Sequence, residues 1–287
     1  MLTRIDLPVV RESGTGLPVI PGTGLSGTAR AYAAMQIDRS RCAGKGGGDG
    51  TEHCGRPDCP ICIAFGYSRG TAGSRQGLVQ ISTAHILLAP IATRSGTVWV
   101  TSRERLATAG LTGDAPAPAD DSHFLPSWVA APADPANGDF GWLELQRGPR
   151  LPSTPRTWTF PSSVKDGAAA APSGLPAAIT GRLSKVAVVP DSIFPTLVND
   201  NLEVRTSVAI DPNTGAAEDK ALFTYEAIPR ATLFWFDVTV SSPTTMGNVN
   251  VDFAALETAV KDGLKLMPFL GVGGMTTRGL GRVEIHE

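Results

Sequence analysis

The sequence has little charge and no excess of basic residues. Its 287 residues include 25 lysines and arginines against 27 acidic residues, a formal net charge of -2, and charged residues make up only 18% of the chain. A protein that binds nucleic acid on its own usually carries a basic surface, so the composition argues against a stand-alone nucleic-acid-binding protein. Hydrophobic residues make up 42%, which is typical of a globular protein and excludes disorder throughout.

Long apolar runs are also absent from the sequence. No stretch reaches the roughly 18 apolar residues that a transmembrane helix needs, and the N-terminal MLTRIDLPVV lacks the apolar segment of a signal peptide. We therefore expect a cytoplasmic protein with no membrane partner. Tandem repeats are absent too, which excludes a solenoid.

Cysteine is scarce, and all four residues lie between positions 42 and 62, in CAGKGGGDGTEHCGRPDCPIC. The turn Cys-Pro-Ile-Cys can direct two thiolates at one tetrahedral ion. Disulfides or four unrelated thiols are the alternatives, but a cytoplasmic protein rarely keeps disulfides. The spacing predicts a structural zinc ion bound by Cys42, Cys54, Cys59 and Cys62, with His53 adjacent as a substitute ligand. Four ligands leave no open position, so the ion would fasten this glycine-rich segment and would not catalyse.

The stretch GLPVIPGTGLSGTARAYAAM, residues 16–35, contains an abrupt junction between a strand and a helix. Residues 17–20 have the pattern of a strand end, and apolar residues recur at helical spacing from Leu25 onward. The turn at 21–24 would direct the first N–H groups of the helix outward, where they form a site for an anion such as phosphate. Neither the dinucleotide-binding spacing nor the Gly-Lys-Ser/Thr of a Walker loop is present. Most such junctions bind nothing, so the residues alone leave this site undecided.

The rest of the sequence mixes strand and helix patterns and predicts an α+β fold. Strands are predicted at 78–90, 97–102, 185–189, 202–210, 221–228, 232–240, 267–270 and 282–286, and helices at 103–109, 192–198 and 251–266. Two stretches rich in alanine and proline, 112–138 and 161–176, contain few large apolar residues and are predicted to be mobile loops.

Several motifs occur in a fixed order along the chain. They are IDLPVV at 5–10, LPVIPGTGLSGTAR at 17–30, HILLAPIATRSGTVWVTS at 85–102 and GVGGMTTRGLGRVEI at 271–285. In this order they resemble the RAMP-superfamily backbone subunit of type III CRISPR effector complexes, most closely that of the Cmr (III-B) module. The resemblance implies one ferredoxin-like (RRM-like) RAMP domain over residues 1–287, with a zinc knuckle at 42–62 and a thumb hairpin at 210–229. The first strand of the family's sheet, ahead of its aspartate loop, is missing from the sequence.

The resemblance also implies a function. Family members line up along a guide RNA, and each copy grips a short segment and cleaves complementary target RNA at regular intervals with a divalent metal ion, Mg2+ or Mn2+. The implied partners are the CRISPR guide RNA, the complementary target RNA, copies of the same subunit and other type III effector subunits. Two alternatives stay open. One is a scaffold subunit of the same assembly without nuclease activity, and the other is a zinc-stabilised α+β protein that does not bind RNA.

By the same resemblance, two glycine-rich loops contact the RNA backbone. The residues implied are Gly22, Thr23, Gly24, Ser26 and Arg30 in the first loop and Gly274, Thr277 and Arg278 in the second. Ser26 stands where the family usually has a lysine. Taken by itself, Arg278 is equally well explained as a solvated loop arginine.

Asp6 resembles the target-cleaving aspartate of the family, and Glu226 falls at an acidic position of the thumb. A carboxylate suits RNA cleavage because it can hold a divalent metal near the scissile phosphate or orient the 2'-hydroxyl for attack. Without the resemblance, Asp6 is only an N-terminal acid, and Glu226 is explained as a solvent-facing strand carboxylate. His85 is a candidate base, but its apolar strand context favours a structural role.

Overall fold

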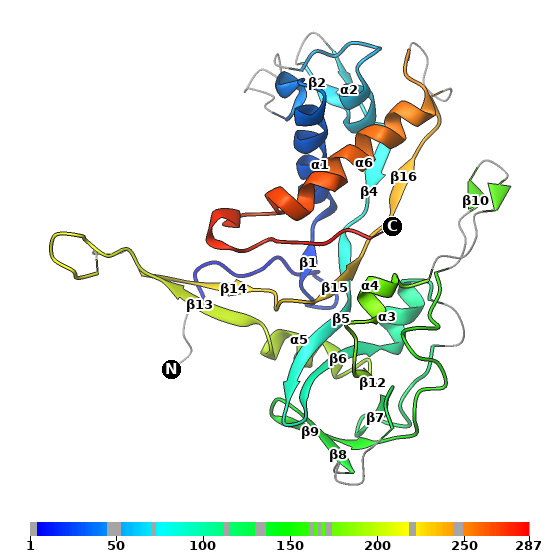
Figure 1. Ribbon diagram of the computed structural model, residues 1–287, viewed down its shortest axis with the longest axis vertical. Coiled ribbons are helices and arrows are strands. Elements are labelled where there is room, and N and C mark those ends of the chain that lie inside the picture. The colour runs from blue at the N-terminus through cyan, green and yellow to red at the C-terminus, as the bar shows by residue number, and fades with distance from the viewer. Residues whose placement is uncertain are drawn as a thin grey trace. The chain divides into compact units, whose positions relative to one another are not determined.

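The structure is a computed structural model with a mixed α+β fold (Figure 1). It describes residues 5–44, 53–69, 73–111, 115–129, 136–160, 164–165, 168–169, 174–217, 222–243 and 249–286. The chain divides into two compact units: unit 1 is Met1–Val19 with His85–Trp235, and unit 2 is Ile20–Ala84 with Phe236–Glu287. The domain predicted over 1–287 therefore consists of two units, each built from two separate segments of the chain.

Unit 1 is built on a mixed sheet whose strands are not in sequence order. From one edge the order is β1 (Val19–Ile20), β5 (Ala84–Thr93), β6 (Gly96–Ser102), β12 (Val186–Val189), β7 (His123–Pro126), β9 (Leu143–Arg147) and β8 (Asn137–Phe140), and β15 (Leu233–Trp235) also pairs with β5. β12 runs parallel to β6 and antiparallel to β7. The helices of this unit are α3 (Arg103–Thr108), α4 (Ala177–Thr180) and α5 (Phe194–Asp200).

Strand β12, in the middle of this sheet, is buried on both faces. Successive residues of β12 belong alternately to two hydrophobic clusters, with Ala187 and Val189 in one and Val186 and Val188 in the other. The first cluster also contains Phe124, Phe140, Phe194 and Leu197, and the second contains Leu88, Leu106 and Trp158. A strand that is covered on both faces has a continuous apolar sequence, which explains why VAVV was recognisable as a strand.

Part of the predicted mobile loop at 112–138 is a strand of this sheet, which corrects that prediction. In β7, Phe124 and Leu125 are buried between the partner strands β12 and β9. The apolar run of β7 is short and lies among alanine, proline and aspartate. Its sequence therefore did not indicate a strand, because the strands that bury it are distant in the sequence. In the second predicted loop, 161–176, the structure describes a short pair of strands, β10 (Val164–Lys165) and β11 (Ala168–Ala169). Residues 112–114, 130–135, 161–163, 166–167 and 170–173 lie outside the described residues.

The hairpin predicted at 210–229 is present and begins earlier in the chain. β13 (Glu203–Ser207) pairs antiparallel with β14 (Phe223–Ala227), and a bridge joins Ile210 to Ala217 beyond the strand ends. Apolar side chains project into solvent from this hairpin, since Val204, Ile210 and Leu222 are 54%, 53% and 64% exposed. Ahead of β1, residues 5–18 form no regular strand, and a bridge joins Leu7 to Tyr225 of β14.

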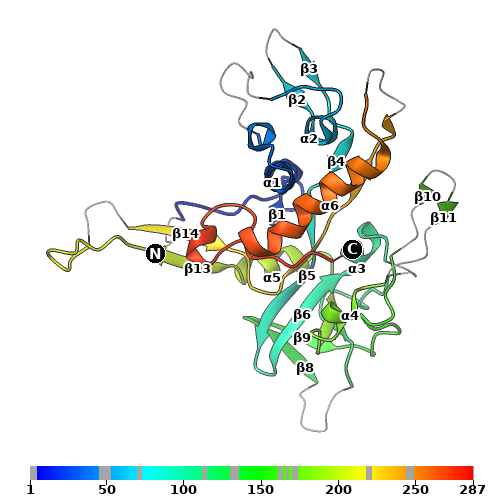
Figure 2. The same cartoon turned by 45° about the horizontal axis from the view of Figure 1, so that its top comes forward.

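Unit 2 packs helices against short strands (Figure 2). Its elements are α1 (Gly22–Gln36), η1 (Ser40–Cys42), α2 (Pro60–Phe65), β2 (Tyr67–Ser68), β3 (Ser74–Arg75), β4 (Val79–Ile81), β16 (Val238–Val240), α6 (Phe253–Leu270) and η4 (Thr276–Arg278). β4 pairs with β16, and β2 pairs with β3. α1 and α6 approach closely, because a Cβ on Gly263 would lie only 2.3 Å from the Ala29 carbonyl oxygen.

α6 is longer than predicted. It continues through 267–270, which the sequence pattern assigned to a strand, although Pro268 lies in its last turn. Met267 is fully buried and extends the apolar face that Leu256, Val260 and Leu264 form at helical spacing, so burial outweighs the unfavourable proline. The strand predicted at 282–286 does not form. None of the described helices is both long and apolar enough to cross a membrane.

The close contact between α1 and α6 predicts that a methyl group added at Gly263 lowers the stability of the protein. Gly263→Ala should lower the free energy of unfolding by about 1–3 kcal/mol, because the new Cβ has to displace the backbone of α1. Gly27→Ala, on α1 with no heavy atom within 4 Å of the added Cβ, is the matched control and should stabilise the protein by about 0.4–1 kcal/mol. Urea unfolding curves measure both changes, and equal stability of the two variants would contradict the packing described.

Candidate functional site

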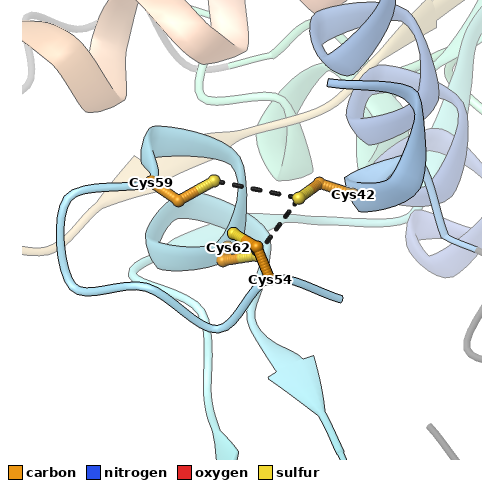
Figure 3. Close-up of side chains that lie close together, drawn as sticks. All are labelled: Cys42, Cys54, Cys59 and Cys62. Atoms are coloured by element: carbon orange, nitrogen blue, oxygen red, sulfur yellow. Dashed lines mark hydrogen bonds between the residues drawn. The ribbon is translucent and has the colours of Figure 1, made fainter. Parts of the chain in front are cut away.

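The side chains of the four cysteines converge in unit 2 (Figure 3). Cys42 ends η1, Cys59 is the N-cap of α2, Cys62 lies within α2, and Cys54 precedes that helix. The Sγ–Sγ distances are 3.6 Å for Cys54 and Cys62, 3.7 Å for Cys42 and Cys62, and 3.9 Å for Cys42 and Cys59. A disulfide needs about 2.05 Å, and all four thiols are free.

These distances fit a tetrahedral metal site. Zinc binds thiolates at about 2.3 Å, which places the corners of the tetrahedron about 3.8 Å apart. Cys42, Cys59 and Cys62 are fully buried, so water has little access to the cluster. In the described part of the chain, the cysteines are the one group of three or more side chains placed to share a metal, and His53 is not in it. The four thiols can therefore hold a metal ion without His53.

Close contact makes the thiols unequal. The pKa of Cys59 is lowered to about 5, chiefly because the Cys62 thiol donates a hydrogen bond to it. The pKa of Cys62 is raised by the same contact and by burial, and burial raises the pKa of Cys42. Cys59 therefore ionises more readily than Cys42 and Cys62. A metal ion would have to displace the thiol protons, so its binding depends on pH.

Arg30, which the resemblance implied as a phosphate contact, donates hydrogen bonds to two main-chain carbonyls. Its Nε donates a hydrogen bond to the Cys42 carbonyl at 2.7 Å, and its Nη1 donates to the Gly66 carbonyl at 2.8 Å. Its Nη2 is buried as well. Burial lowers the pKa of Arg30, while the neighbouring cysteines, Cys62 foremost, act in the opposite direction. The guanidinium group thus lies beside the cysteine cluster, in contacts that sequence spacing does not reveal.

The first turn of α1 offers fewer free donors than predicted. Gly22 is buried, and its N–H donates to the Thr83 hydroxyl at 3.3 Å, while the Gly24 N–H donates to the Pro21 carbonyl at 2.9 Å. A Cβ on Gly22 would lie 2.4 Å from the Ile81 carbonyl oxygen, so this glycine permits close packing of α1 on β4. Thr23 and Gly24 are exposed, and Ser26 is half-buried.

The second predicted RNA-binding loop lies in the same unit. Gly274, Thr277 and Arg278 are exposed around η4. The loop is closed by a hydrogen bond from the Val272 N–H to the Gly281 carbonyl at 2.8 Å. The Tyr32 hydroxyl of α1 donates to the Gly271 carbonyl at 2.8 Å, so α1 holds the start of this loop.

Asp6 lies in unit 1, and β14 holds it in place. Its carboxylate Oδ2 accepts hydrogen bonds from the Thr224 N–H at 2.9 Å and from the Thr224 hydroxyl at 3.2 Å. Its own N–H donates to the Thr224 carbonyl at 3.1 Å. The residue is exposed, so its carboxylate is both fixed and accessible.

Glu226, the second candidate catalytic acid, makes contacts that hold the N-terminal segment. Its Oε1 lies 2.8 Å from Arg11 Nη2, and its Oε2 accepts a hydrogen bond from the Val9 N–H at 3.0 Å. These contacts, Arg11 foremost, lower the pKa of Glu226. Its side chain is only 9% exposed, so the description as a solvent-facing carboxylate is wrong as well. Arg11 Nε also donates to Asn199 Oδ1 at 2.9 Å, and the pair fixes the segment that carries Asp6.

His85 has the surroundings of a structural residue. It is half-buried in β5, with its Nδ1 4.0 Å from a Glu12 carboxylate oxygen and its ring 5.8 Å from that of Trp235. Sequence reasoning missed Arg11, Thr224 and Asn199, because each acts on a residue about two hundred positions away, and no local pattern marks such a contact.

Comparison with known proteins identifies the family. The sequence profile of the RAMP superfamily matches residues 1–284, so the chain belongs to the RAMP superfamily. This confirms the resemblance seen in the motifs. The chain is 26% identical to the CRISPR system Cmr endoribonuclease Cmr4 of Pyrococcus furiosus, over 98% of this chain and 87% of that relative.

Solved structures have the same fold. One is the type III-B Cmr-beta complex bound to cognate target RNA, with a TM-score of 0.58 at 16% identity, covering 97% of this chain and 87% of the matched chain. Another is oligomeric Cmr4 from Pyrococcus furiosus, with a TM-score of 0.54 at 18% identity, covering 96% and 89%. The mixed α+β architecture of both units is thus that of the superfamily.

The Arg11–Glu226 pair predicts a pH dependence of stability. Because the folded-state pKa of Glu226 lies below its ordinary value of 4.5, the pair stabilises the protein above that pH, and this contribution is lost as the pH falls through the folded-state pKa. Glu226→Gln should lower the free energy of unfolding by about 1–2 kcal/mol at neutral pH. The deficit relative to wild type should shrink below about pH 4.5.

The matched control for this prediction is Glu257→Gln, which alters an exposed pair on α6 with Lys261. It should change stability by less than about 0.5 kcal/mol at any pH. Chemical denaturation at several pH values measures the difference. A Glu226→Gln deficit that stays constant down to acidic pH would contradict the ion-pair explanation.

Proposed function

We propose that this chain is a guide-RNA-binding backbone subunit of a type III-B CRISPR ribonucleoprotein and that it cleaves complementary target RNA at regular intervals. The observation that carries the proposal is the similarity to the Cmr endoribonuclease Cmr4 over 98% of the chain. The proposed partners are guide RNA, target RNA, further copies of this subunit and other effector subunits, and the proposed location is the cytoplasm. The same similarity disfavours a zinc-stabilised protein that binds no RNA.

The proposed catalytic group is the Asp6 carboxylate. Its Oδ2 is occupied by Thr224, which leaves Oδ1 available to an RNA phosphate or 2'-hydroxyl. Magnesium is often bound by one or two carboxylates together with substrate phosphates. Asp6 would therefore share an Mg2+ or Mn2+ ion with the RNA, and the ion would stabilise charge on the scissile phosphate. The chain's own contribution is to fix the carboxylate in advance, because Thr224 holds both its main chain and its side chain.

The proposed RNA contacts use hydroxyl and main-chain groups more than charge. Thr23 and Gly24 at the start of α1, and Gly274, Thr277 and Arg278 in the C-terminal loop, are exposed in unit 2. Such groups bind phosphate oxygens without reading bases. A ferredoxin-like arrangement of unit 2 is supported by α1 and α6, which pack on each other and on β4 and β16, respectively. The β13–β14 hairpin is the proposed thumb.

A scaffold subunit without nuclease activity remains the second candidate. It is favoured by the position of Glu226, because the second acid of the predicted catalytic set is engaged in an ion pair with Arg11. Only one carboxylate of that set is then left for chemistry.

The proposed ion in the cysteine cluster is structural zinc. Four buried or half-buried thiols at tetrahedral spacing suit Zn2+, and such an ion would hold η1 against α2. Arg30 links the same two segments through the Cys42 and Gly66 carbonyls, so metal and arginine would stabilise one structure together.

Replacing Asp6 tests the cleavage proposal. Asp6→Asn keeps an acceptor for Thr224 but removes the charge, so cleavage of a matched RNA by the reconstituted complex should fall at least about 100-fold. Assembly and target binding should be unchanged, because a group that acts in the transition state changes rate and not affinity. Asp121→Asn, an exposed acid elsewhere in unit 1, is the control. Equal cleavage by Asp6→Asn and wild type would remove Asp6 from the mechanism, and no cleavage by either would favour the scaffold.

Removing one thiol tests the zinc proposal. Protein purified without chelator should contain about one zinc per chain, and Cys59→Ser should lose it together with much of the thermal stability of unit 2, because a structural zinc ion contributes directly to folding. Metal analysis and thermal denaturation with and without chelator measure both effects. Wild-type protein well below one zinc per chain, or a Cys59→Ser variant of unchanged stability, would contradict a structural zinc site.

A further inference from the structure

A metal ion bound by four thiolates raises a problem of charge. Zn2+ with four thiolate ligands carries a net charge of two minus. Cys42, Cys59 and Cys62 are fully buried, so most of this charge lies away from water. A buried charge without a partner is strongly unfavourable. The protein around the cluster is therefore expected to supply positive charge.

Arg30 is the first such group. It reaches the cluster from α1, and two of its nitrogens hold the Cys42 carbonyl and the Gly66 carbonyl, at 2.7 Å and 2.8 Å. Cys42 is a ligand residue, and Gly66 ends the helix that carries Cys62. The third nitrogen, Nη2, is buried and has no hydrogen-bond partner among the described residues. The Arg30 guanidinium group thus has one buried N–H donor, at Nη2, without an acceptor among the described residues.

Arg69 is arranged in a similar way beside Cys54. Its Nη1 donates to the carbonyl of Cys54 at 3.4 Å, and its own N–H donates to the Gly73 carbonyl at 2.9 Å. Its Nε is buried and lacks a hydrogen-bond partner in the described structure. Each of the two arginines therefore holds the main chain of a ligand cysteine and keeps one buried N–H group.

Arg56 shows the contrasting case. It lies between Cys54 and Cys59 in sequence, but its side chain is 60% exposed and paired with Asp58 at 2.7 Å. The Asp58 carboxylate offsets its charge, and water screens its remaining interaction with Cys54 and Cys59. Arg30 and Arg69 together supply two positive charges, which would balance the two negative charges of a zinc ion with four thiolates.

We infer that Arg30 and Arg69 neutralise the charge of the metal centre and so set how tightly it holds its ion. The inference rests on the proposed zinc site and assigns these two side chains a role in it. Arginine suits this role because its guanidinium does not lose its proton in proteins, so the compensating charge is permanent. Without that charge the buried, negatively charged centre would be less stable, and the ion would be held less tightly.

The test measures zinc retention by the full-length protein, with Arg30→Gln, Arg69→Gln and the control Arg56→Gln. Zinc release is followed with a colorimetric chelator at neutral pH and during acidification from about pH 7.5 to 4.5. Arg30→Gln and Arg69→Gln should each weaken zinc binding about 10-fold or more, in the range known for residues that support metal ligands. Each should also raise the pH of half-release, whereas Arg56→Gln should match wild type.

Weaker zinc binding from any cause raises the pH of half-release, so the comparison of Arg30→Lys with Arg30→Gln separates charge compensation from simple bracing. Arg30→Lys keeps the charge and should hold zinc more tightly than Arg30→Gln, and it also serves if the glutamine variant fails to fold. The inference would be overturned if Arg30→Gln or Arg69→Gln released zinc at the same pH as Arg56→Gln. It would also be overturned if Arg30→Lys and Arg30→Gln lost the same zinc affinity. Wild-type protein that retains no zinc would instead refute the zinc proposal itself.

Discussion

The ion pair between Arg11 and Glu226 is the interaction on which the proposed catalytic site depends. The segment that carries Asp6 forms no regular strand of its own, so its position is set by contacts with β14, which follows more than two hundred residues later. The pair fixes this segment, and the hydrogen bonds from Thr224 then orient the carboxylate. The segment of the proposed catalytic residue, Asp6, is thus held by Glu226, which was itself a candidate catalytic residue.

The predictions from sequence succeeded where the chemistry is local. The strand at 97–102 and the convergence of four cysteines follow from short-range pattern and spacing, and the structure contains them. The stretch 78–90 is extended as predicted, but it forms two strands, β4 and β5, in different sheets. Local patterns do not reveal contacts with distant partners. They did not show the pairing of Glu226 with Arg11 or the two carbonyls that Arg30 binds. The strand β7 was missed because its burial is supplied by β12 and β9, which no local window contains.

Several of the arginines in this weakly charged sequence bind other parts of the chain. Arg11 and Arg30 make contacts inside the protein, and Arg69 donates to the main chain of the cysteine segment. The surfaces proposed to contact RNA present threonine and glycine beside few cations. Such a surface gives each copy a weak hold on phosphate, so strong binding would arise from many copies that grip one RNA together.

The β13–β14 hairpin has a consequence for the life of this chain in a cell. It projects Val204, Ile210 and Leu222 into solvent, and exposed apolar side chains promote nonspecific association and attract quality-control proteases and chaperones. A subunit made in excess of its partners would keep these apolar side chains exposed. Such free subunits would be removed by turnover, so the subunit would accumulate only when its partners are synthesised in balance with it.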